Sequence, residues 1–221
     1  MNAKLIACRV MIDEIRRLLA EEIETEVFEI SQHTRPKLLK QALQEAINRA
    51  DGKHDFILLG YGLCSNAVAG LVASKSTLVV PRIHDCIGIF LGSNRAYQAE
   101  MAHEPAYFLP HGYITGYTIA SCGPLAEVDR AARRYGQERA ERIVGEMMKP
   151  YKRLVYIHTS EASDLEKDRR YSRDMATHFH MRYEEKVGTS ILLHKLVNQN
   201  WDDDFVVAAP GQTITIEQFM N

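Results

Sequence analysis

Apolar runs of strand length alternate with segments of helical period along the whole chain. The runs that predict buried strands cover residues 4–10, 25–31, 54–62, 77–81, 106–114, 153–159, 181–187 and 204–211. The intervening segments predict helices at residues 11–23, 37–50, 65–74, 86–104, 125–149, 165–179 and 191–200. Such alternation is typical of parallel strands covered by helices on both faces. The pattern therefore predicts a three-layer α/β fold with a mostly parallel sheet.

The second part of the chain repeats the order of elements found in the first. KLIAC matches RLVYI, TEVFEIS matches MRYEEKV, and DFILLGYG matches DFVVAAPG. We interpret residues 1–221 as a single α/β domain that contains two pseudo-repeated, Rossmann-like halves, 1–124 and 150–221, joined by a long helix over 125–149. The second half has no cysteine, so any site built from thiols would belong to the first half.

Composition narrows the classes of partner. The chain has 27 Lys and Arg against 29 Asp and Glu, a net charge of -2, and the two signs are mixed along its length. This balance argues against binding to nucleic acid or to a membrane surface. The first 15 residues are too charged for a secretion signal, and no apolar stretch reaches the length of a membrane span. We expect a soluble, cytoplasmic protein that binds a small molecule or a metal cofactor, and the sequence leaves self-association into a homo-oligomer open.

Three of the four cysteines follow predicted strands. Cys8 follows KLIA near the end of the first strand, Cys64 follows FILLGYGL, and Cys86 follows TLVVPRIHD. Ligands bind open α/β sheets at the edge where the carboxyl ends of the strands meet. Three thiolates gathered there would suit zinc or an iron–sulfur cluster and would leave one position open. The sequence therefore predicts a metal site at this edge.

The neighbours of these cysteines are candidates for supporting roles. His84 could supply a fourth ligand, while Asp85 could orient that histidine or cap a helix that begins at Cys86. A helix beginning near Ser65 would direct its positive end at the Cys64 thiolate and lower its pKa. The residues predicted to border a bound group are Gly60, Tyr61, Gly62, Ser65, Asn66 and Asp85.

Two other interpretations of the cysteines stay open. Free cysteine often packs as a small buried hydrophobe, and the spacing of these residues matches no zinc-ribbon or ferredoxin motif. Alternatively, Cys64 is the nucleophile of a cysteine hydrolase, on a strand-to-helix turn similar to G-x-S-x-G, although Asn66 replaces the last glycine. If the cysteines do bind a metal, the protein is either an enzyme or a non-catalytic accessory protein that holds a metal or cofactor. Cys122 precedes a helix and is interpreted as a turn residue that could reach the same pocket. The aromatic run 107–118, which includes His111, Tyr113 and Tyr117, could form one wall of a pocket.

The stretches YGLC, VVPRIHDCIGIFLGS and YFLPHGYI resemble an uncharacterised bacterial and archaeal family, the domain of unknown function 1638. The resemblance covers roughly residues 4–210. It implies cysteines at the positions of Cys8, Cys64 and Cys86 but not of Cys122. By association, it also implies a link to corrinoid-dependent methyltransferase components in one-carbon metabolism. A departure at GYITG, where the family more often has tryptophan after the glycine, weakens a binding role for Tyr113.

Overall fold

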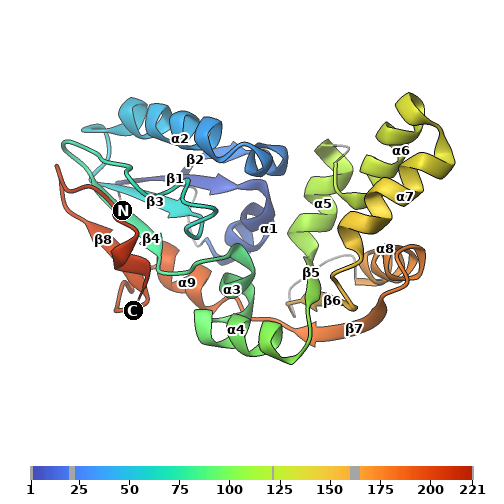
Figure 1. Cartoon of the computed structure of the whole chain (residues 1–221). Coiled ribbons are helices and arrows are strands. Elements are labelled where there is room, and N and C mark those ends of the chain that lie inside the picture. The colour runs from blue at the N-terminus through green and yellow to red at the C-terminus, as the bar shows by residue number, and fades with distance from the viewer. Residues whose placement is uncertain (1, 20–22, 121, 160–164, 221) are drawn as a thin grey trace.

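The chain forms two sheets that lie side by side (Figure 1). The computed structural model describes residues 2–19, 23–120, 122–159 and 165–220. The larger sheet contains, in order across it, β2 (Glu24–Phe28), β1 (Ala3–Cys8), β3 (Phe56–Gly60), β4 (Thr77–Pro81) and β8 (Phe205–Ala208). The smaller contains β5 (Ala106–Pro110), β6 (Arg153–His158) and β7 (Arg182–Val187). All pairings are parallel except that of β4 with β8.

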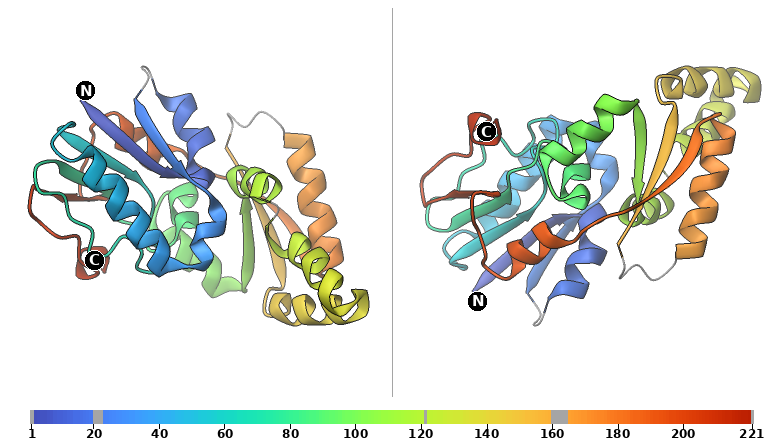
Figure 2. Two further views of the ribbon diagram at one scale, coloured as in Figure 1. Left: turned by 90° about the horizontal axis from the view of Figure 1, so that it is seen from above. Right: turned by 90° about the horizontal axis from the view of Figure 1, so that it is seen from below.

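Helices cover both sheets. Those around the larger sheet are α1 (Arg9–Leu18), η1 (Ile30–Thr34), α2 (Pro36–Ala50), α3 (Cys86–Leu91), α4 (Asn94–His103), α9 (Ile191–Val197) and η2 (Glu217–Phe219). Those around the smaller sheet are α5 (His111–Ala120), α6 (Pro124–Tyr135), α7 (Gln137–Met148) and α8 (Leu165–His178). In Figure 2, α2 lies on one face of the larger sheet and α9 on the other. Each sheet and the helices around it form one lobe. The contact between α1 and α5 joins the two lobes.

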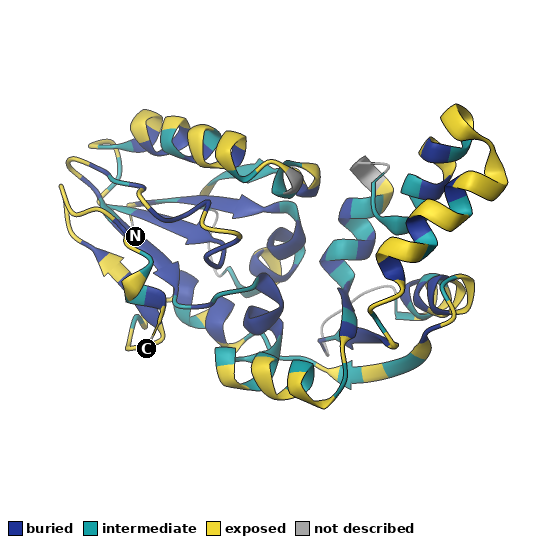
Figure 3. Ribbon diagram, viewed as in Figure 1, coloured by how far each residue is buried: buried dark blue, intermediate teal, exposed yellow. Residues whose placement is uncertain are grey.

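The central strands of the larger sheet are buried on both faces (Figure 3). Continuous apolar runs such as LIAC in β1 and ILL in β3 produce this burial, because helices pack against each face of a parallel sheet. A second group of buried residues, which includes Leu109, Leu154 and Met175, fills the smaller lobe between β6 and its helices. Among the described residues, no helix combines the length and the apolar character needed to cross a membrane.

The predicted α/β class and mostly parallel pairing are confirmed, but several elements differ. Residues 65–74 form turns and no helix. The helix predicted over 86–104 is divided into α3 and α4 at Gly92, which adopts φ 85°. The helix predicted over 125–149 is likewise two helices, because Gly136 adopts φ 82° between α6 and α7. The strand predicted over 106–114 ends at Pro110, where α5 begins.

The match of DFVVAAPG with DFILLGYG suggests that the last strand, β8, belongs to one sheet with β6 and β7, but β8 lies in the larger sheet. β6 and β7 pair with each other in the smaller sheet, whereas β8 returns to the larger sheet and runs antiparallel to β4. The chain therefore leaves the first lobe at β5 and re-enters it at α9. The domain boundary and the pseudo-repeated halves stay predictions.

Candidate metal centre

The larger sheet brings three cysteines to one edge. Cys8 is the last residue of β1, Cys64 lies in the turn after β3, and Cys86 is the first residue of α3, after β4. Because β1, β3 and β4 are parallel neighbours, their carboxyl ends meet at the same edge. All three cysteines are buried and free, and the Sγ atoms of Cys64 and Cys86 are 2.9 Å apart.

A histidine that the sequence analysis did not single out completes this group. His33 lies in η1, which follows β2 at the same edge of the sheet. Its Nε2 lies 4.0 Å from Sγ of Cys86, and its Nδ1 lies 3.9 Å from Sγ of Cys8. Among the described residues, one ligand atom each of His33, Cys64 and Cys86 lies within 4.8 Å of the others, so this group could hold a metal ion. The strand predicted over residues 25–31 ends just before His33, and this position after a strand is the signal for it in the sequence.

The distances within the group suit a tetrahedral ion after a small adjustment. With zinc–sulfur bonds of about 2.3 Å, two thiolates on a tetrahedral zinc lie about 3.8 Å apart, and a thiolate and an imidazole nitrogen lie about 3.5 Å apart. The 2.9 Å between Cys64 and Cys86 is shorter than the first distance, and the 4.0 Å between Cys86 and His33 is longer than the second. Shifts of less than about 1 Å would bring both to the values of a metal site.

A left-handed turn positions Cys64. Cys64, Ser65 and Asn66 adopt φ values of 48°, 54° and 66° in succession, a conformation that non-glycine residues rarely adopt. The backbone N–H of Cys64 donates to the carbonyl of His84 at 3.3 Å, which ties this turn to the loop before α3. Gly62 permits the approach, because a Cβ there would lie 2.8 Å from the carbonyl oxygen of Ile83. No helix begins at Ser65, so the predicted effect of a helix terminus on Cys64 was wrong.

Helix α3 positions Cys86. Asp85 is its N-cap, and Oδ1 of Asp85 accepts a hydrogen bond of 2.9 Å from the backbone N–H of Ile87. Burial, together with the neighbouring charge of Cys86, raises the pKa of the Asp85 carboxyl. Asp85 was expected either to orient His84 or to cap the helix, and in the structure it caps α3.

The two close thiols have opposite pKa shifts. The hydrogen bond with Cys64 and the contact with His33 hold the pKa of Cys86 well below its usual value, against the effect of burial. The same hydrogen bond and burial raise the pKa of Cys64. Burial lowers the pKa of His33, but the contacts with Cys8 and Cys86 outweigh it and raise that pKa to about 11. The cluster therefore favours a Cys86 thiolate beside a charged imidazole, with the remaining proton on Cys64.

Tyr61 adds an unsatisfied polar atom to the group. Its side chain is fully buried, and its hydroxyl has no hydrogen-bond partner among the residues that the structure describes. Its ring stacks on His33 with 6.3 Å between centroids. Burial and the charges of the three cysteines raise its pKa. A buried hydroxyl normally has a partner, so this one indicates that water or a bound group belongs beside the cluster.

The other predicted site residues are not part of the group that could hold a metal ion. His84 Nε2 donates to the carbonyl of Phe219 at 2.5 Å, and His84 is not part of the group that could share an ion. Gly60 lies in β3, where a Cβ would come within 2.8 Å of the Cβ of Ala7. Ser65 and Asn66 are exposed at the turn. Cys122 lies outside the cluster and is partly exposed.

Comparison with known proteins identifies a family. A family model described as "Protein of unknown function (DUF1638)" matches residues 27–197. No curated protein and no solved structure gives a match. The matched stretch contains His33, Cys64 and Cys86, whereas Cys8 lies before it.

Proposed function

The chain belongs to the DUF1638 family, and we propose that it binds one zinc ion through Cys64, Cys86 and His33 and leaves a fourth position open for a small molecule. The observation that carries this proposal is the approach of three ligand atoms to within 4.8 Å. They come from segments far apart in the sequence, and all three lie at the edge of the sheet where ligands bind.

The types of ligand support zinc over the other metals considered. Soft thiolates disfavour magnesium and calcium, which prefer oxygen ligands. Iron–sulfur clusters usually require four protein ligands, most of them cysteines. Two thiolates and one imidazole are instead the protein ligands of one class of catalytic zinc site, in which water or substrate takes the fourth position.

We assign Cys8 a supporting role, although the sequence predicts it as a ligand. Its Sγ lies against Nδ1 of His33, the ring nitrogen opposite the one near Cys86. A partner on the second nitrogen fixes the tautomer and orientation of a histidine that binds metal through the first. Cys8 would then tune the affinity for metal without contributing a bond.

The charge balance of the proposed zinc site supports activation of a thiol or sulfide at the fourth position on the metal. Two thiolates neutralise the charge of Zn²⁺, and a thiol that binds zinc loses its proton. When the two cysteine thiolates already balance the charge of Zn²⁺, a third thiolate bound to the same ion keeps much of its nucleophilic character. Acceptance of a methyl group from corrinoid-dependent methyltransferase components would fit this chemistry, and that part of the proposal depends on the family resemblance alone.

The short contact between Cys64 and Cys86 supports a second candidate, a reactive thiol that needs no metal. The hydrogen bond between the two sulfurs stabilises a thiolate at Cys86, and a thiolate is the nucleophilic form of cysteine. The nucleophile would then be Cys86, with Cys64 as its hydrogen-bond donor, whereas the sequence analysis assigned Cys64 this role.

Elemental analysis of protein purified without oxygen separates these candidates. We expect about one zinc per chain and no visible absorption, since Zn²⁺ has a filled d shell. Iron with acid-labile sulfide would indicate a cluster instead. Cys86→Ser is expected to lose the zinc, while Cys122→Ser is the matched control and is expected to keep it. Metal-free wild-type protein in which Cys86 alone reacts with iodoacetamide at neutral pH would replace the zinc site with the reactive thiol.

A further inference from the structure

A cavity of about 420 Å³ lies between the two lobes, beside His33. Residues of η1 line one side of it, and residues of α5, α6 and α7 line the other. Its volume is within the range of small-molecule sites. Because His33 belongs to both the cavity wall and the candidate metal centre, a molecule in the cavity would contact a ligand of that centre.

Tyr113 forms a second link between the cavity and the cysteines. It lines the cavity, and burial together with the charges of Cys86, Asp85 and Cys8 raises the pKa of its phenol. Tyr113 also packs against the buried core to which Cys8, Cys64 and Cys86 belong. The cavity therefore borders that core at Tyr113, in addition to the candidate metal centre at His33.

Away from His33, the chemistry of the walls indicates an occupant with an apolar body. Tyr107 and Tyr117 share a hydrogen bond of 2.7 Å between their hydroxyls. Glu127 and Arg130 form an ion pair of 2.9 Å with each other. These polar groups satisfy one another, so the walls offer mainly aromatic rings, thioethers and aliphatic groups. Such walls suit an aromatic or aliphatic body.

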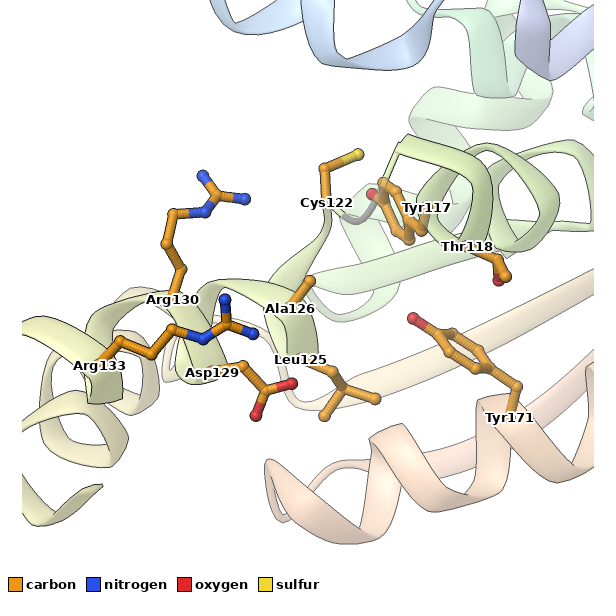
Figure 4. A pocket seen from close by; sticks show the side chains of 9 residues that line it. All are labelled: Tyr117, Thr118, Cys122, Leu125, Ala126, Asp129, Arg130, Arg133 and Tyr171. Carbon is orange, nitrogen blue, oxygen red and sulfur yellow. The ribbon is translucent and has the colours of Figure 1, made fainter. Parts of the chain in front are cut away.

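A second pocket, of about 450 Å³, is less suitable for the same ligand (Figure 4). It shares Tyr117, Cys122 and Arg130 with the first cavity, and α6 contributes Asp129 and Arg133 to it. Its lining includes no residue of the candidate metal centre. A molecule in this second pocket would therefore not contact a residue of that centre, whereas one in the cavity beside His33 would.

We propose that this cavity binds a small organic thiol with an aromatic or aliphatic body, whose sulfur completes the metal centre. This inference rests on the proposed zinc site. Binding would form one sulfur–metal bond, displace the water from the fourth position and release the thiol proton to solvent. The hydroxyl of Tyr61, buried beside the cysteines and without a partner among the described residues, could donate a hydrogen bond to the incoming sulfur.

The test uses full-length protein loaded with Co²⁺, which occupies zinc sites and absorbs visible light when thiolates bind it. The Co²⁺ protein is titrated with benzyl mercaptan and, separately, with 2-mercaptoethanol. Both should increase the sulfur-to-cobalt absorption that Cys64 and Cys86 already produce. Benzyl mercaptan should bind about tenfold to a hundredfold more tightly, because its ring leaves water for the apolar cavity.

Two pairs of variants locate the binding. Ser31→Trp fills the cavity beside His33 and should reduce the affinity for benzyl mercaptan to that of 2-mercaptoethanol. Ser74→Trp, at an exposed residue outside the cavity lining, should change neither affinity. If Ser31→Trp fails to take up Co²⁺, Met147→Ala replaces it. Met147 lines the cavity and is 64% exposed, and the matched control is Met220→Ala, at a site that is 61% exposed and outside the cavity.

The possible failures are distinguishable. Wild-type protein that binds no Co²⁺ would overturn the metal site and this inference with it. Protein that binds Co²⁺ but has equal affinity for the two thiols would overturn the inference alone. Tighter binding of benzyl mercaptan that neither cavity variant reduces would also overturn it, because the ring would then lie elsewhere.

Discussion

The Sγ atoms of Cys64 and Cys86 lie 2.9 Å apart although 22 residues separate the two cysteines in the sequence. One comes from a left-handed turn and the other from the first residue of α3, and backbone hydrogen bonds join these two segments. The two thiols therefore form one unit that metal binding, or its loss, should affect as a whole.

The first prediction follows from this coupling. Cys64→Ser and Cys86→Ser should each remove most of the zinc, because a site with three protein ligands loses both charge and geometry with one of them. The double substitution should cost almost nothing more than either single one. Zinc per chain and urea unfolding, measured on the four proteins, test this directly. If the cysteines are only packing groups, each serine should instead cost about 1–3 kcal/mol of unfolding free energy, with no zinc in any of the four proteins.

A second prediction concerns the strain at the same turn. Ser65 is exposed and adopts φ 54°, which glycine accepts without a steric cost. Ser65→Gly should therefore raise the unfolding free energy by about 0.5–1 kcal/mol, after the entropy that glycine adds to the unfolded chain is subtracted. Ser74 is also exposed but lies outside the left-handed region. Ser74→Gly should leave stability unchanged or lower it, and a gain from both substitutions would contradict the role of φ.

The cysteines illustrate which part of the site could be predicted from the sequence. Apolar runs mark buried parallel strands, and the residues just after such strands share one edge, so the positions of Cys8, Cys64 and Cys86 could be inferred. His33 follows β2 at the same edge, but its segment is a short 3-10 helix with no strong pattern. The arrangement of its ring between two sulfurs depends on tertiary contacts.

Contacts between segments far apart in the sequence explain where the structure differs from the predicted elements. Residues 65–74 contain many small and apolar residues that favour a helix, yet contacts outside the segment determine their path: Gly70 N–H donates to the carbonyl of Ile214 at 2.7 Å. β8 pairs with β4, which lies more than 100 residues earlier in the chain. Strand pairing at that range leaves no local signal in the sequence.

A third prediction tests the contact between the lobes. A Cβ on Gly112 in α5 would lie 1.9 Å from the carbonyl oxygen of Val10 in α1. Backbone atoms cannot yield as a side chain can, so Gly112→Ala should lower the unfolding free energy by at least about 3 kcal/mol, the upper range for overpacking. Gly145 in α7 is the matched control, because a Cβ there would meet no described atom within 4 Å. Gly145→Ala should raise stability by up to about 1 kcal/mol, as measured by urea unfolding.

The last prediction concerns a histidine away from the metal centre. His111 Nδ1 bonds Oδ2 of the buried Asp168 at 2.6 Å, and its Nε2 lies 4.0 Å from Oδ2 of Asp13 in α1. The hydrogen bond with Asp168 and the charges of both carboxylates raise the pKa of His111, against the effects of burial and of the Arg17 charge. The charged imidazole therefore links α5 to both α8 and α1.

The sign of the pH dependence follows from that shift. A histidine whose pKa is raised in the folded state stabilises the protein fully below its unfolded pKa of about 6.5. That contribution is lost as the pH rises through the folded pKa. Between pH 6.5 and the raised pKa of His111, the unfolding free energy of the wild type should therefore fall more steeply than that of His111→Gln, as measured by urea unfolding at several pH values. Tyr156→Phe is the control, because it removes a hydroxyl 3.2 Å from Asp168 but keeps the ion pair. It should lower stability without removing the slope, and parallel curves for the wild type and His111→Gln would contradict the link.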